Sequence, residues 1–381
     1  MNTEQLLRAL VNCPTVNPMG GRILPDLHLE NRVVDVLASV LQEARIPFTR
    51  RTVAPGRDNL LTTFTPKSPT GHLLWESHTD TVAVTGMTID PFAGTTRDGK
   101  LYGRGACDVK GGLTAMLQAF LRLHREQPEQ CAQVTLACTV DEEHTFLGVQ
   151  DLVKNGLKVD GAIVAEPTSL NIVNCHKGVI RWHLQTTGVA CHSSRPQDGV
   201  NSIYRMTRII QLLQEHAQHL QSSPPHPLLG PPSLSVGKIE GGVSVNTVPD
   251  RCLIEIDRRM LPGEKAAEIH ENLMKLIAQS GVPDVSVTTT LTCPALQPDL
   301  SQLLTQQLGA SINAVVGHHQ VLAVPYGTDA STLAEAGIPA VVFGPGDIAQ
   351  AHTKDEWIEL QQIDIASEIL YHAAKTFPVA G

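Results

Sequence analysis

The feature that most restricts the fold of this 381-residue chain is an alternation of short apolar runs with segments of helical period. The apolar runs are bounded by Gly, Pro or charged residues and lie at 72–77, 134–140, 162–165, 321–324 and 340–343. Runs of this kind are typical of parallel strands buried on both faces of a sheet. Because helical segments separate them, the sequence predicts an α/β domain whose sheet is covered by helices on both faces.

The clearest helical segment follows Gly111-Gly112 and runs to about residue 126. Its apolar side chains recur at i, i+3, i+4, i+7 and i+8, at Leu113, Met116, Leu117, Phe120 and Leu121. This spacing places all of them on one face of a helix, which predicts that the helix packs against a sheet.

Residues 178–291 follow a different order and predict a second domain. They alternate as strand, helix, two strands, helix and strand at 180–187, 201–220, 233–239, 252–260, 264–280 and 285–291. That order is typical of a small ferredoxin-like α+β layer. We therefore predict one large α/β domain formed by 1–177 and 292–381, interrupted by a smaller inserted domain at 178–291.

Composition excludes several functional classes. Apolar residues make up 42% of the chain and charged residues 18%, as in a globular protein with a substantial core. The net charge is −9 and no basic run exceeds two residues, which excludes a nucleic-acid partner. No apolar run reaches the roughly 18 residues of a membrane span, and the start shows no secretory signal. Eight scattered cysteines without a C-x-x-C pair favour reduced thiols in the cytoplasm.

Histidines and carboxylates gather in five short stretches at or near strand ends, at 77–80, 103–112, 141–143, 165–168 and 351–353. In extended chain, residues two apart face the same side. Asp80 can therefore hydrogen-bond one ring nitrogen of His78 and leave the other for a metal ion. Each stretch taken alone is common in proteins, and only their combination indicates a metal site.

The Gly-rich stretch 103–112 allows two interpretations. A glycine-rich turn before a helix can cradle a phosphate, but a P-loop requires Ser or Thr where Gly111 follows Lys110. The acidic end of strand 134–140 resembles part of a nucleotide hydrolase, yet that P-loop partner is missing. We therefore expect Asp108 to present its carboxylate to a cation at this turn, where glycines let the backbone approach closely.

Together the stretches supply a metal-binding donor set, consisting of His78, Asp108, Glu143, Glu166 and His352, with Glu142 left over. Imidazole and carboxylate donors without thiolate suit Zn²⁺ in a hydrolytic site. One carboxylate that bridges two ions about 3.5–4 Å apart is the usual two-metal arrangement. Three consecutive carboxylates repel one another unless a cation or a raised pKa neutralises part of the charge, which favours one as ligand and its neighbour as general base.

These motifs resemble those of the M20 zinc metallohydrolases, which include acetylornithine deacetylase, succinyl-diaminopimelate desuccinylase, aminoacylases and carboxypeptidases. The resemblance covers nearly the whole chain in order and rests on 77–80, 98–112, 141–143, 165–168, 191–196 and 351–353. It implies a phosphorylase/hydrolase-like zinc-exopeptidase catalytic domain with an inserted lid and dimerisation domain.

The resemblance also implies a role for each donor. His78, Asp108 and Glu166 would hold one zinc ion, and Asp108, Glu143 and His352 the other, with Asp108 bridging. Asp80 would orient His78, and Glu142 would act as the general base. Two Zn²⁺ per subunit are expected, for which Co²⁺ can substitute.

Further residues are implied outside the metal site. His192, in the insert, would reach the active site of a neighbouring subunit and stabilise the oxyanion, so a homodimer is expected. Asn246 and Arg259 would contact the substrate carboxylate, with Arg258 as the alternative to Arg259. Gly327 and Thr328 would line the amino-acid end of the pocket.

The function implied by this resemblance is removal of the acyl group from an N-acyl amino acid, of acetylornithine deacetylase or succinyl-diaminopimelate desuccinylase type. A metallocarboxypeptidase or dipeptidase would use the same metal residues and is the alternative. A non-catalytic homologue is disfavoured because Glu142 is present, and its loss would be the expected mark of such a protein.

Overall fold

The computed structural model describes residues 1–377 and divides the chain into two compact units. Unit 1 holds Met1–Asn174, Gln297–Leu322 and the segment from Thr328 on, and unit 2 holds Cys175–Leu296 and Ala323–Gly327. The sequence placed the insert at 178–291 and did not reveal the return of 323–327 to it. That short segment is tied to unit 2 by a backbone hydrogen bond, in which Lys177 N–H donates to Val324 O (3.2 Å).

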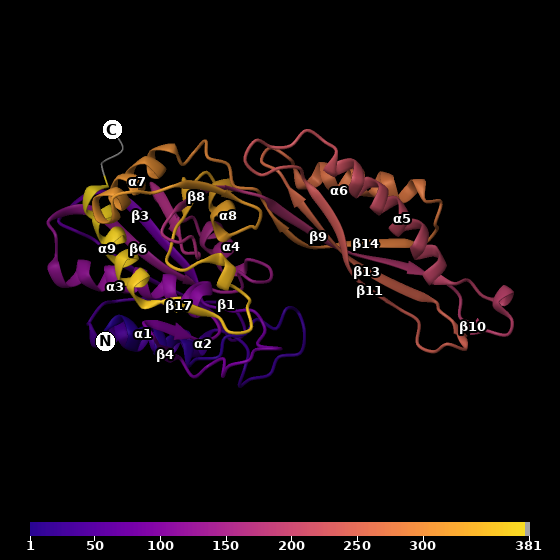
Figure 1. Ribbon diagram of the computed structural model, residues 1–381, viewed down its shortest axis with the longest axis horizontal. Helices are drawn as coiled ribbons and strands as arrows, with labels where there is room; N and C mark the ends of the chain where they lie inside the picture. Colours follow the sequence, from indigo (N-terminus) through magenta and orange to yellow (C-terminus); the bar gives the residue numbers. More distant parts are fainter. Residues whose placement is uncertain (378–381) are drawn as a thin grey trace. The chain divides into compact units, whose positions relative to one another are not determined.

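Unit 1 is built on a mixed eight-stranded sheet (Figure 1). In sheet order its strands are β1 (Thr49–Ala54), β2 (Arg57–Phe64), β6 (Gln130–Thr139), β3 (Ser68–His78), β7 (Gly161–Val164), β16 (Ala340–Val342), β8 (Ile172–His176) and β15 (Val321–Val324). The four central strands β6, β3, β7 and β16 run parallel, whereas β1, β2 and β8 pair antiparallel. The predicted run at 321–324 is a strand, but it lies at the sheet edge and is partly exposed, so it is not buried on both faces as expected.

Helices cover both faces of this sheet, because successive strand–helix–strand connections move along the sheet in opposite directions. They are α1 (Thr3–Val11), α2 (Asn31–Glu43), α3 (Gly111–Glu126), α4 (Leu147–Lys154), α7 (Gln302–Val316), α8 (Asp329–Glu335) and α9 (Leu360–Thr376). From β3 the chain passes through α3 to β6, and from β6 it returns through α4 to β7 on the other side of β3. Right-handed crossovers then put α3 and α4 on opposite faces, and β6 is accordingly buried along its whole second half.

The main hydrophobic core lies between the sheet and α1, α2, α3, α7 and α9. The predicted stripe of α3 supplies Leu113, Met116, Leu117 and Phe120, each at most 1% exposed, while Leu121 is only partly buried. A separate three-stranded sheet pairs β4 (Thr95–Arg97), β5 (Lys100–Tyr102) and β17 (Trp357–Glu359). Pairing of β5 with β17 in this small sheet places the segment that leads into residue 103 beside the segment that follows residue 356.

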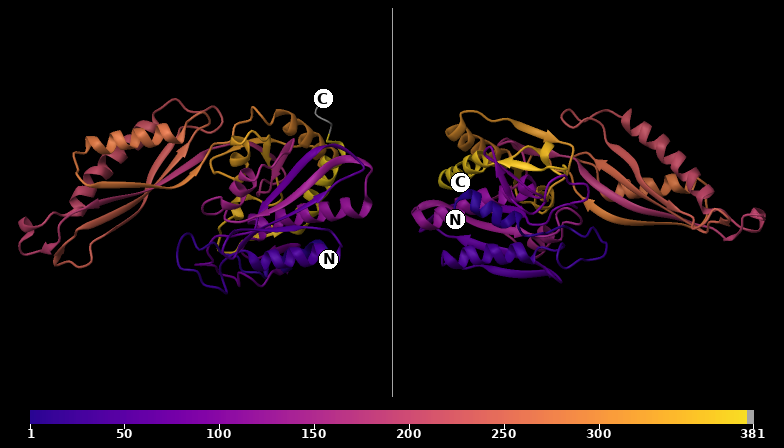
Figure 2. Two further views of the ribbon diagram at one scale, coloured as in Figure 1. Left: turned by 180° about the vertical axis from the view of Figure 1, so that it is seen from behind. Right: turned by 60° about the horizontal axis from the view of Figure 1, so that its bottom comes forward.

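Unit 2 is the predicted α+β layer (Figure 2). Its sheet has the order β11 (Ser233–Gly241), β13 (Arg251–Met260), β9 (Gly178–Thr187) and β14 (Val285–Cys293), all antiparallel, with α5 (Ser202–Gln221) and α6 (Ala266–Gln279). Alternate residues of β13 are buried with residues of both helices in a second core, so the helices cover one face. No helix in residues 1–377 is long and apolar enough to span a bilayer.

Candidate metal centre and catalytic groups

Three of the predicted site segments lie at the same edge of the sheet in unit 1. Strands β6, β3 and β7 are neighbours and run parallel, so their carboxyl ends meet there. His78 ends β3 and pairs in register with Thr139, the last residue of β6, which lies two residues before Asp141. Glu166 follows the end of β7 by two residues. The sheet therefore fixes the relative positions of these ligand-bearing segments.

Asp108 lies between the two predicted histidine ligands. Its Oδ1 is 3.2 Å from His78 Nε2, and its Oδ2 is 3.3 Å from His352 Nε2. Glu166 Oε1 lies 3.9 Å from His78 Nε2, and Glu143 Oε1 lies 3.4 Å from His352 Nε2. Each oxygen of one carboxylate thus faces a different imidazole, as a ligand that bridges two ions requires.

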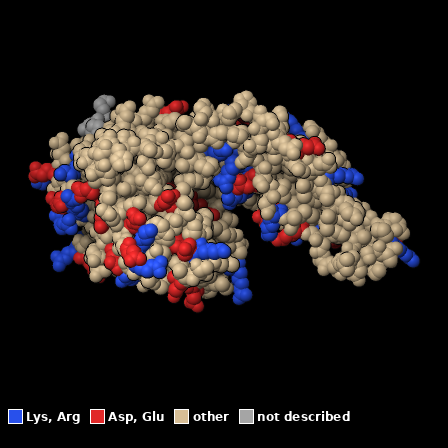
Figure 3. Space-filling view, in the orientation of Figure 1, with Lys and Arg blue, Asp and Glu red and all other residues tan. Residues whose placement is uncertain are grey.

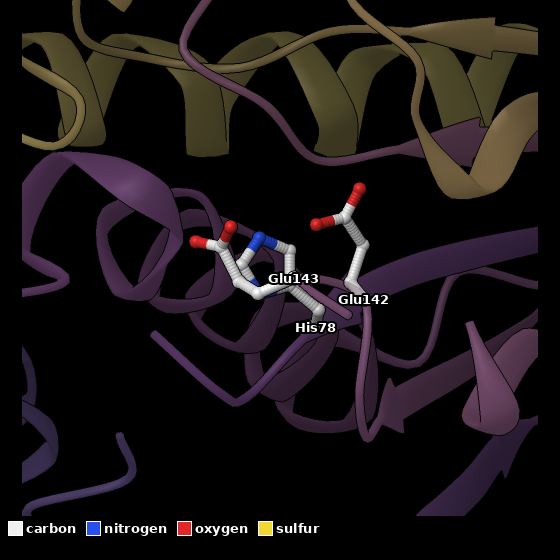
Figure 4. Close-up of side chains that lie close together, drawn as sticks. All are labelled: His78, Glu142 and Glu143. Carbon is white, nitrogen blue, oxygen red and sulfur yellow. The ribbon is translucent and has the colours of Figure 1, made fainter. Parts of the chain in front are cut away.

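The donors form three groups within reach of one ion each, His78–Asp108–Glu166, Asp108–Glu143–His352 and His78–Glu142–Glu143. Figure 4 shows the last group, with a ring nitrogen of His78 between the carboxylates of Glu142 and Glu143. The oxygen and nitrogen donors suit Zn²⁺. The buried Glu143 Oε1 makes no hydrogen bond. No Lys or Arg of residues 1–377 forms an ion pair with Asp108, Glu142, Glu143 or Glu166, so divalent cations fit the site.

Asp80 connects His78 to the loop that carries Glu142 and Glu143. Its carboxylate accepts hydrogen bonds from the backbone N–H of Glu142 (3.1 Å) and of Glu143 (3.2 Å). The ring Nδ1 of His78 lies 3.0 Å from the backbone oxygen of Asp80 and 3.5 Å from its carboxylate. The sequence pointed to the carboxylate as the partner of the ring, whereas the nearer acceptor is the carbonyl. In either case Nδ1–H is engaged and Nε2 faces the carboxylates of Asp108 and Glu166.

Behind Asp80 lies a buried polar network that the sequence did not reveal. Asn17 Nδ2 donates to both Asp80 Oδ2 and Asp141 Oδ1 (2.8 Å each). Arg57 pairs with Asp141 and lies 3.4 Å from Glu30 Oε2. These partners come from segments far apart in the chain, and no local motif marks Asn17 or Arg57. Of this network, the sequence marked only Asp141, as the first residue of the acidic run 141–143.

The charges of the site shift its pKa values in opposite directions. Burial alone would raise the pKa of Asp108 and lower that of His78. The hydrogen bonds between these two side chains, and between Asp108 and His352, outweigh burial. The pKa of Asp108 is therefore lowered, and the pKa of His78 is raised well above its usual range. Hydrogen bonds to the carboxylates of Asp108 and Glu143 raise the pKa of His352 to about 10. Burial raises the pKa of Glu142 well above that of a free glutamate.

In unit 2, His192 and Asn246 lie on neighbouring segments. His192 belongs to β10 (Cys191–His192), which pairs with β12 (Thr247–Val248), and Ser193 N–H donates to Asn246 O (3.0 Å). The backbone N–H of Ser194 donates to His192 Nδ1 (3.1 Å). Since Nδ1 accepts, the neutral ring carries its proton on Nε2, which is left as a donor.

The two candidate arginines face opposite sides of β13. Arg258 is 2% exposed and donates to Glu264 Oε1 (2.6 Å), so it lies on the helix-covered face. Arg259 lies on the other face, partly exposed, and its Nε donates to Asp257 Oδ1 (2.8 Å).

Gly327 and Thr328 stand at the boundary between the units. Gly327 belongs to unit 2, and Thr328 is buried in unit 1 as the N-cap of α8, accepting a hydrogen bond from Ala330 N (3.3 Å). The structure therefore gives Thr328 a helix-capping contact.

Residues 74–376 match the sequence signature of Peptidase family M20/M25/M40. The chain belongs to this family. It is 30% identical to an acetylornithine deacetylase of Proteus mirabilis over 99% of this chain and 97% of that one. An acetylornithine deacetylase of Myxococcus xanthus is 32% identical, with 79% of this chain and 78% of the relative covered.

Solved structures show the same M20 fold. An M20 family metallo-carboxypeptidase of Sulfolobus solfataricus matches with a TM-score of 0.81 at 19% identity, covering 100% of both chains. A Bacillus subtilis protein described as a dinuclear metal-binding peptidase of the M20 family matches with a TM-score of 0.71 at 16% identity, covering 98% of this chain and 96% of that one. The resemblance on which the sequence analysis relied is thus confirmed, and the chain is an M20 metallohydrolase.

We predict that zinc uptake by the metal-free protein releases protons. The pKa of His352 is raised to about 10 and that of His78 well above its usual range, which favours the protonated rings, and a histidine must lose this proton to become a ligand. Zinc affinity should therefore rise with pH and fall as the solution is acidified. Titration calorimetry in buffers of different ionisation enthalpy measures the protons released, and we expect at least two per subunit.

The variant His352→Ala should release at least one proton fewer, whereas His183→Ala, on the exposed surface of unit 2, should behave like the unaltered protein. A binding heat that does not depend on the buffer would contradict this prediction.

Proposed function

We propose that this chain is a zinc-dependent amidohydrolase that removes the acyl group from an N-acyl amino acid, of acetylornithine deacetylase or succinyl-diaminopimelate desuccinylase type. The observation that carries the proposal is the Asp108 carboxylate shared between His78 and His352, with Glu142 beside it. The relatives named acetylornithine deacetylase support the substrate class. Eight free cysteines accord with our assignment to the cytoplasm.

In this proposal two zinc ions bind per subunit, and cobalt can replace them. His78, Asp108 and Glu166 hold one ion, and Asp108, Glu143 and His352 hold the other. When bound, such ions lower the pKa of water toward neutrality and polarise the carbonyl of the scissile amide. Asp80 keeps the His78 ring in place through its contacts with Nδ1.

Glu142 acts as the general base and then as the general acid. Its carboxylate takes a proton from the attacking water and later delivers it to the leaving amine. A base works best when its pKa lies near the working pH, and burial of Glu142 shifts its pKa in that direction. Its backbone N–H is held by Asp80, which keeps the loop and hence the carboxylate in position.

His192 supplies an oxyanion donor to the site of a second subunit. The Nδ1 of His192 accepts from Ser194 N–H, so its Nε2–H is free to donate to a negative oxygen. Unit 2 also offers a surface for the homodimer. Val243, Val245 and Tyr204 are 91%, 100% and 71% exposed, and Figure 3 shows few charged side chains around β10.

The substrate carboxylate is held by Asn246 and Arg259, with Gly327 and Thr328 at the amino-acid end of the pocket. Arg259 is favoured over Arg258 because it faces the uncovered side of β13, while Arg258 is buried against Glu264. A guanidinium can bind a carboxylate with two parallel hydrogen bonds. The alternative function is a metallocarboxypeptidase or dipeptidase, which uses the same ions and base on a peptide.

We predict that Glu142→Gln lowers kcat by about 10²–10⁴-fold, because the amide cannot accept the proton of the attacking water. The variant should still bind two zinc ions per subunit, measured by elemental analysis of the dialysed protein. Glu143→Gln is the contrast, since it removes a ligand and should lose one ion. A Glu142→Gln enzyme with nearly normal turnover would show that another group is the base.

We predict that His192→Ala lowers kcat by about 10²–10³-fold, as expected for the loss of an oxyanion donor. His183→Ala, another exposed histidine of unit 2, serves as the control. Mixing His192→Ala subunits with Glu142→Gln subunits should restore part of the activity, because each mixed dimer contains one site with both groups intact. If exchanged dimers form and stay inactive, His192 does not act across the dimer.

We predict that an N-acyl amino acid is the preferred substrate. The zinc-loaded enzyme would be assayed with N-acetylornithine, N-succinyl-diaminopimelate and a set of dipeptides, with kcat/KM compared across the panel. One of the two acylated substrates should exceed every dipeptide. A dipeptide with the highest kcat/KM would replace the proposal by the peptidase alternative.

A further inference from the structure

Glu356 has no part in the proposed chemistry, yet its fully buried carboxylate accepts four hydrogen bonds. Oε1 accepts from the backbone N–H of Cys107 (2.8 Å) and of Asp108 (3.0 Å). Oε2 accepts from Gly105 N–H (3.1 Å) and from the Arg104 guanidinium (2.6 Å). One side chain therefore holds the turn that presents Asp108, including the backbone of Asp108 itself.

Arg104 extends this contact to two more loops of the site. Its second terminal nitrogen donates to Ala83 O (3.1 Å), in the loop that follows Asp80, and to Thr353 O (3.2 Å), directly after His352. Both Arg104 and Glu356 are buried, at 3% and 0% exposed, so the pair is shielded from water. The Arg104–Glu356 pair thus joins three loops, which carry Asp80, Asp108 and His352.

The two proposed ion sites differ in how their outer ligands are anchored. His78 ends strand β3 and Glu166 follows β7, so the hydrogen bonds of the sheet hold them. His352 lies outside every helix and strand, its side chain is 54% exposed, and its φ of 62° is in the left-handed region. The position of His352 therefore depends on contacts of its loop, among which are those made by Arg104 and Glu356.

We propose that Glu356 is a positioning residue for the ion site formed by Asp108, Glu143 and His352, acting with Arg104 to set the distance between the Asp108 turn and the His352 loop. The inference rests on the proposed function, since it takes the metal ligands from there. Partners of metal ligands typically contribute 10–100-fold to metal affinity. Loss of the Glu356 contacts should weaken this site more than the other, because Asp108 serves both ions but the sheet still holds His78 and Glu166.

The test is Glu356→Gln, which keeps the shape of the side chain. In either orientation the amide nitrogen would face N–H donors where an oxygen now accepts. Glu359→Gln is the matched control, because Glu359 lies three residues on in β17, is partly exposed and makes no side-chain hydrogen bond at the start of α9. Zinc stoichiometry and affinity would be measured by competition with a chromogenic chelator, and the ligand field by the visible spectrum of the cobalt form.

We expect the unaltered protein and Glu359→Gln to bind two ions with the same affinities. Glu356→Gln should lose about 10–100-fold in the affinity of one ion and much less in that of the other, with a changed cobalt spectrum. Adding Glu356→Gln to His352→Ala should cause little further loss at the ion that remains, because the two changes act mainly on the same site. Equal weakening of both ions, or of neither, would overturn the proposal.

Arg104→Lys gives a second measurement should Glu356→Gln fail to fold, as judged by circular dichroism of the metal-free protein. It keeps Glu356 and the positive charge but loses the fork that reaches Ala83 O and Thr353 O. We expect a smaller but equally selective loss, and unchanged affinities would overturn the proposal. If the unaltered protein bound fewer than two ions, the ligand assignment of the proposed function would fail instead.

Discussion

Buried negative charge around Asp108 is the constraint on which the rest of unit 1 depends. Asp80, Asp108, Glu142 and Glu166 are each less than 10% exposed, and like charges 4 Å apart repel by about 4 kcal/mol at an effective dielectric constant of ~20. Burial raises the pKa of Glu142 and of Glu166, which favours the uncharged form of each. The remaining negative charge is balanced by the two imidazoles in the metal-free protein, and by divalent cations once they bind.

Hydrogen bonds from backbone N–H groups to buried carboxylates hold two loops of the site in place. Asp80 accepts the N–H groups of Glu142 and Glu143, and Glu356 accepts those of Cys107 and Asp108. In both cases a buried carboxylate fixes the main chain of a loop that carries candidate metal ligands. Such contacts fix the backbone of a ligand residue and do not occupy its side-chain donor atoms. Those atoms are left available for a metal ion.

The sequence predicted the parts of the fold and site that local patterns encode. His78 and Glu166 adjoin short apolar runs, so the sequence placed both at strand ends, and a period of two related Asp80 to His78. Asn17, Arg57 and Glu356 escaped notice because their partners lie 27 (Arg57–Glu30) to 252 (Glu356–Arg104) residues away, and no spacing rule connects such positions. The antiparallel strands β1 and β2 were missed as well, since polar residues interrupt their apolar pattern. The catalytic roles of the site residues stay predictions.

The candidate metal ligands cannot by themselves decide between an acylated amino acid and a peptide, because the chain is similar both to relatives named acetylornithine deacetylase and to the structure of an M20 metallo-carboxypeptidase. Discrimination must come from groups that contact the parts of the substrate away from the scissile bond. Arg259 meets the physical requirement for one such group. It is partly exposed and already paired with Asp257 through Nε, which orients the guanidinium while its terminal nitrogens can still donate to a second carboxylate. Arg258 could bind a substrate carboxylate only by giving up its hydrogen bond to Glu264 and the core contacts that bury it. Because neighbouring residues of β13 face opposite sides of the sheet, Arg259 is the arginine available to a ligand.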